Sequence, residues 1–276
     1  MLTVAQLLAQ ADLPESPSCA LDAELLLAHV LQKPRSFLRT WPEHSLPPSQ
    51  LELFNALMAR RRAGEPIAYL LGEQGFWSLD LQVNNTTLIP RPDTERLVEL
   101  ALELGPQGRA RVLDLGTGTG AVALALACER PLWDVIATDL VPAAVALADS
   151  NRKRLRLNNV HIMTSDWFFA LDTEPFDLIV SNPPYISADD PHLLRGDVRY
   201  EPASALVSGA DGLDAIRHIV QQAPAFLNRD RWLLLEHGWQ QANAVVALLE
   251  DRGFHQARSW QDLAGQQRIS GGQWRG

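Results

Sequence analysis

Cysteine is nearly absent from this chain, which contains only Cys19 and Cys128 among its 276 residues. Two distant cysteines cannot form a disulfide framework and do not have the spacing of a zinc site. The chain also lacks an apolar run of the roughly 20 residues that a membrane-spanning helix needs. Its first residues lack the basic region of a secretory signal. We therefore expect a cytoplasmic protein without a bound metal and without a membrane association.

An excess of positive charge is missing as well. Lysine and arginine number 24 against 33 acidic residues, so the formal net charge is -9. Proteins that bind long nucleic acids usually carry a basic face, because phosphate neutralisation dominates their affinity. The balance argues against DNA or RNA as the main partner, although a local basic patch remains open. The triplet Arg60-Arg61-Arg62 could contact a partner, but it also suits the C-terminal end of a helix.

The hydrophobic content of 46% is enough for a substantial core, and the patterning predicts three regions. Residues 1–72 carry helical apolar stripes separated by prolines, which predicts a small N-terminal helical bundle. Residues 73–92 are predicted to form a β-hairpin linker. Within it we expect a strand over residues 75–83, a turn at Asn84 and Asn85, and a return strand over residues 87–89.

Residues 93–276 alternate strand and helix patterns to the end of the chain. Such alternation predicts an α/β domain with a mostly parallel, doubly wound sheet. The last two predicted strands, over 255–260 and 267–270, have no helix between them. We therefore expect an antiparallel edge at that side of the sheet.

A glycine-rich loop lies where a predicted strand becomes a helix: Asp114, Leu115, Gly116, Thr117, Gly118, Thr119, Gly120. Glycines let the backbone turn tightly and approach a ligand closely. Asp139 follows Gly120 by 19 residues, at the end of the next strand, where a ribose-binding carboxylate belongs.

Asp114 discriminates between ligands for this loop. A carboxylate just before the loop disfavours a pyrophosphate and suits a ligand with a cationic amino group and a sulfonium. The chain also has no Gly-Lys-Ser/Thr loop for a triphosphate. We predict S-adenosylmethionine as the cofactor. At the end of the following strand, Asp166 could accept from the adenine amino group and Trp167 could flank the ring. Alternatively, Trp167 only fills a gap at the edge of the core.

The turn Asn182-Pro183-Pro184-Tyr185 follows an apolar run over residues 176–180. Asn182 offers a side-chain carbonyl, Pro183 a backbone carbonyl and Tyr185 a flat aromatic face. Two prolines make the turn stiff, so these acceptors are held in place. The set suits a planar –NH₂ group that donates two hydrogens while its plane stacks on a ring. The alternative is a turn that merely ends a strand.

Together with the glycine loop, this turn resembles class I amino-methyltransferases, and further motifs resemble the HemK/PrmC family. The motifs are residues 64–70 (Gly-Glu-Pro-Ile-Ala-Tyr-Leu), Phe76-Trp77, residues 88–95 (Leu-Ile-Pro-Arg-Pro-Asp-Thr-Glu) and residues 235–238 (Leu-Glu-His-Gly). The resemblance covers essentially the whole chain. It implies a Rossmann-like methyltransferase domain after a helical bundle. Because a glutamine side chain offers little binding area, we expect residues 1–72 and the Phe76-Trp77 hairpin to dock the substrate. It further implies methylation of the side-chain amide nitrogen of the glutamine in the Gly-Gly-Gln motif of peptide chain release factors.

Carried onto this sequence, the resemblance implies specific site residues. Cofactor contacts fall on the loop from Gly116 to Gly120 and on Asp139, Trp167 and Asn182, whereas substrate contacts fall on Asn182, Pro183, Pro184 and Tyr185. We expect Asn182, Pro183 and Tyr185 to be catalytic. No definite role follows for Arg91, Glu236 or His237.

The expected reaction is an in-line displacement in which the amide nitrogen takes the methyl group and S-adenosylhomocysteine leaves. The two carbonyl acceptors would orient the nitrogen and favour its developing positive charge. The main alternative is a DNA or RNA amino-methyltransferase that acts on a flipped base with the same turn. A non-catalytic cofactor-binding scaffold would have lost the turn or Asp139, and both are present. The chain's own Gly271-Gly272-Gln273 is interpreted as a chance match to the substrate motif.

Overall fold

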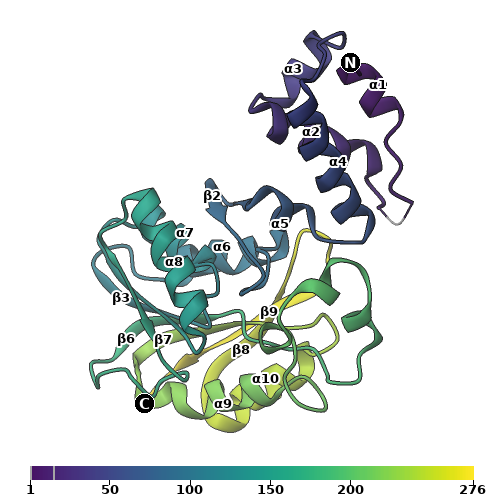
Figure 1. Cartoon of the computed structure of the whole chain (residues 1–276). Helices are drawn as coiled ribbons and strands as arrows, with labels where there is room; N and C mark the ends of the chain where they lie inside the picture. Colours follow the sequence, from purple (N-terminus) through teal and green to yellow (C-terminus); the bar gives the residue numbers. More distant parts are fainter. Residues whose placement is uncertain (1, 15) are drawn as a thin grey trace. The chain divides into compact units, whose positions relative to one another are not determined.

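The computed structural model describes residues 2–14 and 16–276 and divides into two compact units. The helical unit comprises the chain up to Glu73 together with His192–Tyr200, and the sheet unit comprises Gln74–Pro191 and Glu201–Gly276. Figure 1 follows the chain through its elements. In the described part of the chain, no helix combines the length and apolar character required to cross a membrane.

In the residues that the structure describes, the helical unit has five α-helices around a core of its own. These are α1 (Val4–Ala9), α2 (Cys19–Leu31), α3 (Arg35–Thr40), α4 (Pro48–Arg62) and α5 (Ile67–Leu71). Helix α1 begins with a capping box, in which Thr3 and Gln6 exchange side-chain to backbone hydrogen bonds. The hydrophobic core of the helical unit includes Leu26, Leu27 and Phe54, each at most 3% exposed.

A segment from far along the chain, His192–Tyr200, packs within the helical unit. The side chain of Arg61 is 10% exposed and lies between two carboxylates. Its Nε donates to Asp22 at 2.7 Å and its Nη1 to Asp197 at 3.1 Å. The Tyr200 hydroxyl donates to the Ala63 carbonyl at 2.5 Å. The central arginine of the triplet therefore has a structural function beyond the helix dipole, which the sequence did not indicate.

The main sheet of the sheet unit has seven strands in the order β5-β4-β3-β6-β7-β9-β8. Their bounds are β3 Ala110–Leu115, β4 Trp133–Asp139, β5 Val160–Thr164, β6 Phe176–Ser181, β7 Leu227–Glu236, β8 Phe254–Gln261 and β9 Gln267–Trp274. The five neighbouring strands β5, β4, β3, β6 and β7 are parallel. Strand β9 pairs antiparallel with β7, and β8 pairs antiparallel with β9. The predicted α/β class, with a mostly parallel sheet and an antiparallel edge, is confirmed.

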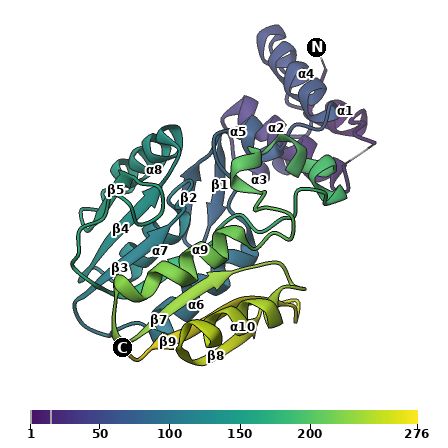
Figure 2. The same ribbon diagram turned by 90° about the horizontal axis from the view of Figure 1, so that it is seen from below.

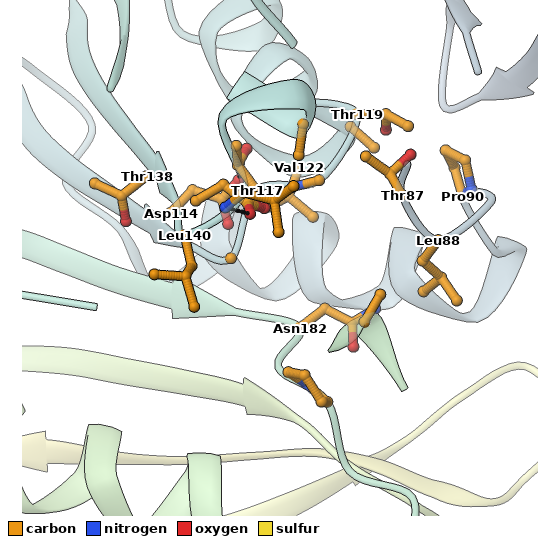
Figure 3. A pocket seen from close by; sticks show the side chains of 18 of the residues that line it. Thr87, Leu88, Pro90, Asp114, Thr117, Thr119, Val122, Thr138, Leu140 and Asn182 are labelled. Atoms are coloured by element: carbon orange, nitrogen blue, oxygen red, sulfur yellow. Dashed lines mark hydrogen bonds between the residues drawn. The ribbon is translucent and has the colours of Figure 1, made fainter. Parts of the chain in front are cut away.

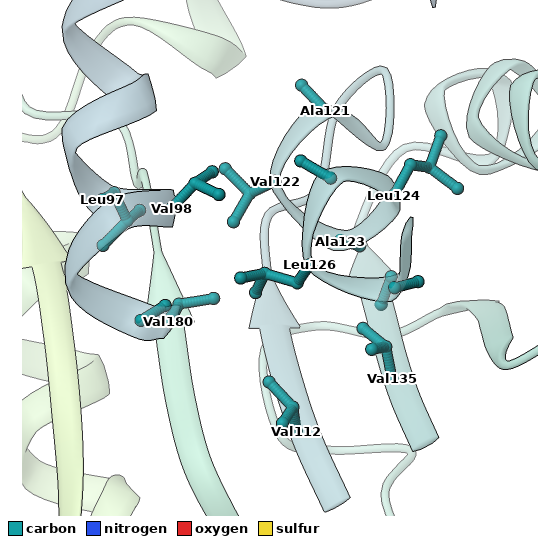
Figure 4. Packing of buried hydrophobic residues seen from close by; sticks show 14 of the residues in the cluster. Leu97, Val98, Val112, Ala121, Val122, Ala123, Leu124, Leu126, Val135 and Val180 are labelled. Carbon is teal, nitrogen blue, oxygen red and sulfur yellow. The ribbon is translucent and has the colours of Figure 1, made fainter. Parts of the chain in front are cut away.

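Helices cover both faces of this sheet (Figures 1 and 2). Those on one face are α6 (Glu95–Leu104), α7 (Ala121–Glu129) and α8 (Pro142–Leu155), and those on the other are α9 (Asp214–Gln222) and α10 (Ala242–Arg252). Successive strand residues alternate between the two faces. Leu178 and Val180 of β6 pack with α6 and α7 (Figure 4), whereas Ile179 packs with α9 and α10.

The predicted strand over residues 75–83 is wrong in its bounds. The chain instead forms β1 (Glu73–Phe76) and β2 (Leu79–Gln82), which pair across a tight turn at Trp77 and Ser78. Trp77 has a left-handed φ of 57°, which a tryptophan rarely adopts. Two carboxylates from helices α6 and α7 fix it: its backbone N–H donates to Glu95 and its indole N–H to Glu129, both at 2.7 Å. Such contacts between distant residues leave no local pattern in the sequence.

Residues 87–89, predicted as the return strand, are not a strand either. They belong to an irregular stretch that lines a pocket of the sheet unit.

Candidate active site

A pocket opens at the carboxyl ends of the parallel strands, where open α/β sheets bind their ligands. It is lined by the glycine loop after β3, the end of β4, the turn after β5, the turn after β6 and the irregular stretch Thr86–Arg91. Figure 3 shows Asn182 at the end of its strand, across the pocket from Asp114, Thr117 and Leu140. Segments widely separated in the sequence thus meet at one place.

The glycine loop adopts a conformation that glycine supplies most easily. Gly116 and Gly118 have φ of 71° and 56°, in the left-handed region. The Gly118 N–H donates to one oxygen of Asp139 and the Val141 N–H to the other, each at 2.9 Å. Burial raises the pKa of Asp139, whereas these backbone donors lower it. The carboxylate is therefore held rigidly at the pocket wall.

Asp114 is 1% exposed, and its side chain accepts hydrogen bonds from neighbouring residues of the protein. It accepts from the Thr117 hydroxyl at 2.6 Å and from the Ala123 N–H at 3.2 Å. Burial raises the pKa of Asp114 to about 6. These contacts tie the glycine loop to the first turn of α7, and Asp114 also lines the pocket.

Most of the residues predicted for the site are in the pocket wall: Asp114, Gly116, Thr117, Gly118, Thr119, Asp139, Trp167, Asn182 and Pro184. Four predicted residues are not among the lining residues: Gly120, Asp166, Pro183 and Tyr185. Asp166 is exposed and does not line the pocket, so its contact with the adenine amino group stays a prediction. Gly120 has a packing function, because a Cβ there would lie 2.9 Å from Leu124.

The turn after β6 is anchored on both sides. Before it, the Ser181 hydroxyl donates to the Leu115 carbonyl at 2.7 Å, which ties β6 to β3. After it, the Ile186 N–H donates to the Leu206 carbonyl at 2.8 Å. Within the turn, the Asn182 Nδ2 donates to the Thr94 hydroxyl at 3.1 Å. The nitrogen of this amide is therefore hydrogen-bonded to the protein, and its oxygen is the end that can accept from a ligand.

Sequence reasoning missed a clamp behind the pocket. Glu201, which is 6% exposed, accepts from the Ile89 N–H at 3.0 Å and from Arg91 Nη2 at 2.6 Å. It joins the stretch Thr86–Arg91 to Ser204 and Ala205, which also line the pocket. Arg91 lay in a motif that the sequence analysis identified. Glu201 lay in none, so only its position in the fold reveals it.

This sheet order, with a glycine loop, an acidic residue ending the next strand and an Asn-Pro-Pro-Tyr turn, defines a class I methyltransferase. A methyltransferase of Pyrococcus furiosus has a similar fold, with a TM-score of 0.55 at 19% identity over 80% of this chain and 98% of that one. Two family models match the chain: the PrmC N-terminal domain over residues 3–72 and the methyltransferase small domain over residues 95–195.

Curated relatives define the family more narrowly. The release factor glutamine methyltransferase of Pseudomonas aeruginosa is 61% identical over 274 residues, covering 99% of each chain. The enzyme of the same name from Vibrio cholerae is 54% identical over 94% of this chain and 91% of its own. The chain belongs to the release factor glutamine methyltransferase family.

Proposed function

We propose that this protein transfers a methyl group from S-adenosylmethionine to the side-chain amide nitrogen of the glutamine in the Gly-Gly-Gln motif of peptide chain release factors. The N–CH₃ bond forms as the S–CH₃ bond breaks, and the products are the methylated glutamine, S-adenosylhomocysteine and the proton that the amide nitrogen loses. Two relatives that cover 99% and 94% of this chain are named release factor glutamine methyltransferases. The observation that carries the proposal is the Asn182 amide at the pocket wall, with its nitrogen bonded to Thr94.

The residues around the pocket fit the cofactor. Gly116 and Gly118 leave two positions of the loop without a side chain, so a ligand can lie close to the backbone there. Asp139 would accept hydrogen bonds from the ribose hydroxyls, and Trp167 would cover one side of the adenine. Thr138 lines the same wall, and its buried hydroxyl has no protein partner in the part of the chain that the structure describes. When bound, S-adenosylmethionine supplies an electrophilic methyl group on a positively charged sulfur.

The Asn-Pro-Pro-Tyr turn orients the substrate amide. The lone pair of an amide nitrogen is delocalised into its carbonyl, so this nitrogen is a poor nucleophile. The Asn182 Oδ1 and the Pro183 carbonyl would accept its two N–H groups and favour positive charge as it develops on the nitrogen. The Tyr185 ring would stack on the amide plane. Orientation and electrostatics, with no further charged group, are the contribution of these residues.

A glutamine side chain offers little area for recognition, so selectivity must come from contacts outside the pocket. We assign these contacts to the helical unit, and we place the reaction in the cytoplasm, where release factors act.

Methyl transfer from labelled cofactor tests the proposal directly. The purified protein is incubated with a release factor, with the same factor carrying glutamine→alanine in its Gly-Gly-Gln motif, and with DNA and RNA. We expect label only in the first reaction, on the peptide that contains the motif. Label in the alanine variant or in nucleic acid would contradict the proposal.

A further inference from the structure

Glu236 is a buried carboxyl that the mechanism above does not use. It ends strand β7 and is 1% exposed. One of its oxygens, Oε2, has no hydrogen-bond partner among the residues that the structure describes. A buried and incompletely bonded carboxyl destabilises a fold, so its presence beside the pocket requires an explanation.

Its neighbours connect it to the Asn-Pro-Pro-Tyr turn. The Tyr185 hydroxyl donates to Glu236 Oε1 at 3.3 Å. Thr94 and Tyr185 both lower the pKa of Glu236 as hydrogen-bond donors, although burial dominates and raises it to about 7. The Thr94 hydroxyl, which lowers the pKa of Glu236, also accepts from Asn182 Nδ2 at 3.1 Å.

We propose that Glu236 is a positioning residue that, through Thr94 and Tyr185, holds the Asn182 amide with its oxygen toward the substrate. The proposal deepens the proposed function and rests on it.

The number of available hydrogens determines the orientation. A threonine hydroxyl has one hydrogen to donate and two lone pairs. When that hydrogen is directed to the Glu236 carboxylate, Thr94 presents a lone pair, and Asn182 must turn its NH₂ end toward it. The Asn182 oxygen is then left for the substrate. Without a carboxylate behind it, Thr94 could donate to the Asn182 oxygen, and the amide would present its NH₂ end to a substrate that is itself a donor.

Tyr185 is fixed in the same way. Burial raises the pKa of Tyr185, so its hydroxyl remains protonated and donates to Glu236. One carboxyl thus sets the orientation of two residues of the turn that lie three positions apart.

The neighbouring residue His237 provides a contrast. It is 0% exposed, its Nδ1 lies 2.9 Å from the Gly238 carbonyl, and its Nε2 lies 2.7 Å from the Ser270 hydroxyl. Burial lowers the pKa of His237, so the ring is neutral, with Nδ1–H donating and Nε2 accepting. The bond to Ser270 ties the residue after β7 to β9, and neither bond reaches the turn. Ser270→Ala is therefore a matched control for the loss of a buried polar contact.

The test compares Glu236→Gln with Ser270→Ala in methyl transfer to a release factor. Glutamine keeps the shape but presents an NH₂ group that competes for the Thr94 lone pair. We expect kcat to fall roughly ten- to a hundredfold, the typical effect of losing a partner behind a functional ligand. KM and the cofactor Kd should stay within about twofold, because Glu236 does not line the pocket. Ser270→Ala should keep kcat near wild type.

An unchanged kcat in Glu236→Gln would overturn the proposal. So would equal losses in kcat and cofactor affinity, because they would indicate a general structural effect. Thr94→Val removes the hydroxyl with little change in shape, and it should lower kcat by a similar factor. Thr94→Ser should restore it. The double variant of Glu236→Gln and Thr94→Val should lose little more than either single variant, since both break one chain of bonds.

A readout without catalysis separates this proposal from the proposed function. In protein labelled with heavy nitrogen, the Asn182 side-chain NH₂ signals are identified by their loss in Asn182→Ala. We expect Glu236→Gln to shift them and Ser270→Ala to leave them in place. A shift in a protein that does not methylate release factors would contradict only the function. Unshifted signals would overturn the positioning proposal whatever the activity.

Discussion

At the scale of single residues, Asn182 divides one amide between two partners. Its nitrogen donates to Thr94 at 3.1 Å, and its oxygen is left to accept from a substrate. Replacing Asn182 by alanine should reduce kcat about a hundred- to a thousandfold, as the loss of a preorganised transition-state contact does. Calorimetry should find a much smaller loss of cofactor affinity. Equal losses in both would make Asn182 a cofactor residue only.

Asp139 is held by two backbone donors and presents its carboxylate at the pocket. Asp139→Ala should weaken cofactor binding roughly ten- to a hundredfold, since charge-assisted hydrogen bonds contribute about 1.5–3 kcal/mol. Part of that loss would come from the Gly118 N–H, which loses its acceptor. Asp139→Asn keeps the shape without the charge and should lie between alanine and wild type. Unchanged cofactor affinity in Asp139→Ala, measured by calorimetry, would remove it from the site.

Glu236 should also give stability an unusual pH dependence. Burial raises its pKa from 4.5 to about 7 in the fold. The charge of Asp93 raises the pKa further, whereas the charge of Arg268 lowers it. The folded state binds the proton more tightly, so stability falls as pH rises from about 4.5 through 7. Glu236→Gln removes the ionisation and should raise Tm above that of wild type at about pH 8, by a free energy on the order of 3 kcal/mol or less.

At about pH 4.5 and below, where Glu236 is protonated in both states, the advantage of glutamine should vanish. Equal Tm values for the two proteins across the whole range, measured by thermal denaturation, would mean that folding does not raise the pKa of Glu236. A stabilised but slower enzyme would identify a residue retained for function at the expense of the fold.

The sequence predicted these residues unevenly, for physical reasons. The glycine loop and Asp139 could be found because a ligand-binding turn and the next strand end have a regular spacing. Glu201 and Thr94 could not, because their function depends on contacts between segments distant in the sequence. Asp166 was expected at the pocket, but it follows a strand end at which only its neighbours Ser165 and Trp167 turn inward.

At the scale of elements, strand β9 explains the Gly-Gly-Gln sequence near the end of the chain. Gly271 and Gly272 pair with Leu234 and Leu233 of β7, in a strand that lies between β7 and the edge strand β8. Gln273 donates from Nε2 to the Asp230 carbonyl at 2.8 Å. Its partner in β7 is Trp232, four residues before the Glu236 end of that strand. The motif is therefore part of the sheet and lies away from the pocket edge.

Gly271→Ala should destabilise the fold by about 1–3 kcal/mol, the usual cost of overpacking a core. A Cβ there would lie 2.6 Å from the Leu233 carbonyl oxygen, which is backbone and cannot move aside. Gly108→Ala is the control, because nothing lies within 4 Å of its new carbon. Denaturant unfolding should find the first variant weakened and the second near wild type. Similar stability of the two variants would contradict this prediction, because it would mean that the sheet can accommodate the added Cβ at residue 271.

Elements with a clear period were predicted well. Helix α8 spans Pro142–Leu155 and is easily recognised in the sequence, because proline starts it and its apolar face repeats regularly. The first half of strand β7 is hard to recognise, since Leu227 is followed there by the polar residues 228–231, which no alternation marks. The hairpin was misplaced because its turn depends on Glu95 and Glu129, and the pair Asn84-Asn85 was the stronger local signal.

At the scale of the whole molecule, we assign recognition of the release factor to the helical unit. Deleting residues 1–72 should leave cofactor affinity within a few fold, because the pocket is lined by the sheet unit alone. Transfer to the whole release factor should fall at least about a hundredfold, since remote contacts supply the binding energy. A short Gly-Gly-Gln peptide should be a poor substrate for both forms and lose little on truncation.

The truncated protein must first be shown to be folded by circular dichroism, because His192–Tyr200 loses its packing partners in it. Asp197→Asn is a milder companion, since it weakens only the contact with Arg61. If peptide and whole protein lose transfer equally in the truncated form, the helical unit does not recognise the substrate.

The placement of His192–Tyr200 within the helical unit has a consequence for swapping parts between relatives. A chimaera that exchanged only the N-terminal seventy or so residues would join a foreign Arg61 environment to the native Asp197 and Tyr200. The helical unit is thus encoded by two separate stretches of the gene, one for the chain up to Glu73 and one for His192–Tyr200. Substitutions at Asp22 or Arg61 should be compensated by changes more than a hundred codons downstream, and functional hybrids should require both stretches from the same parent.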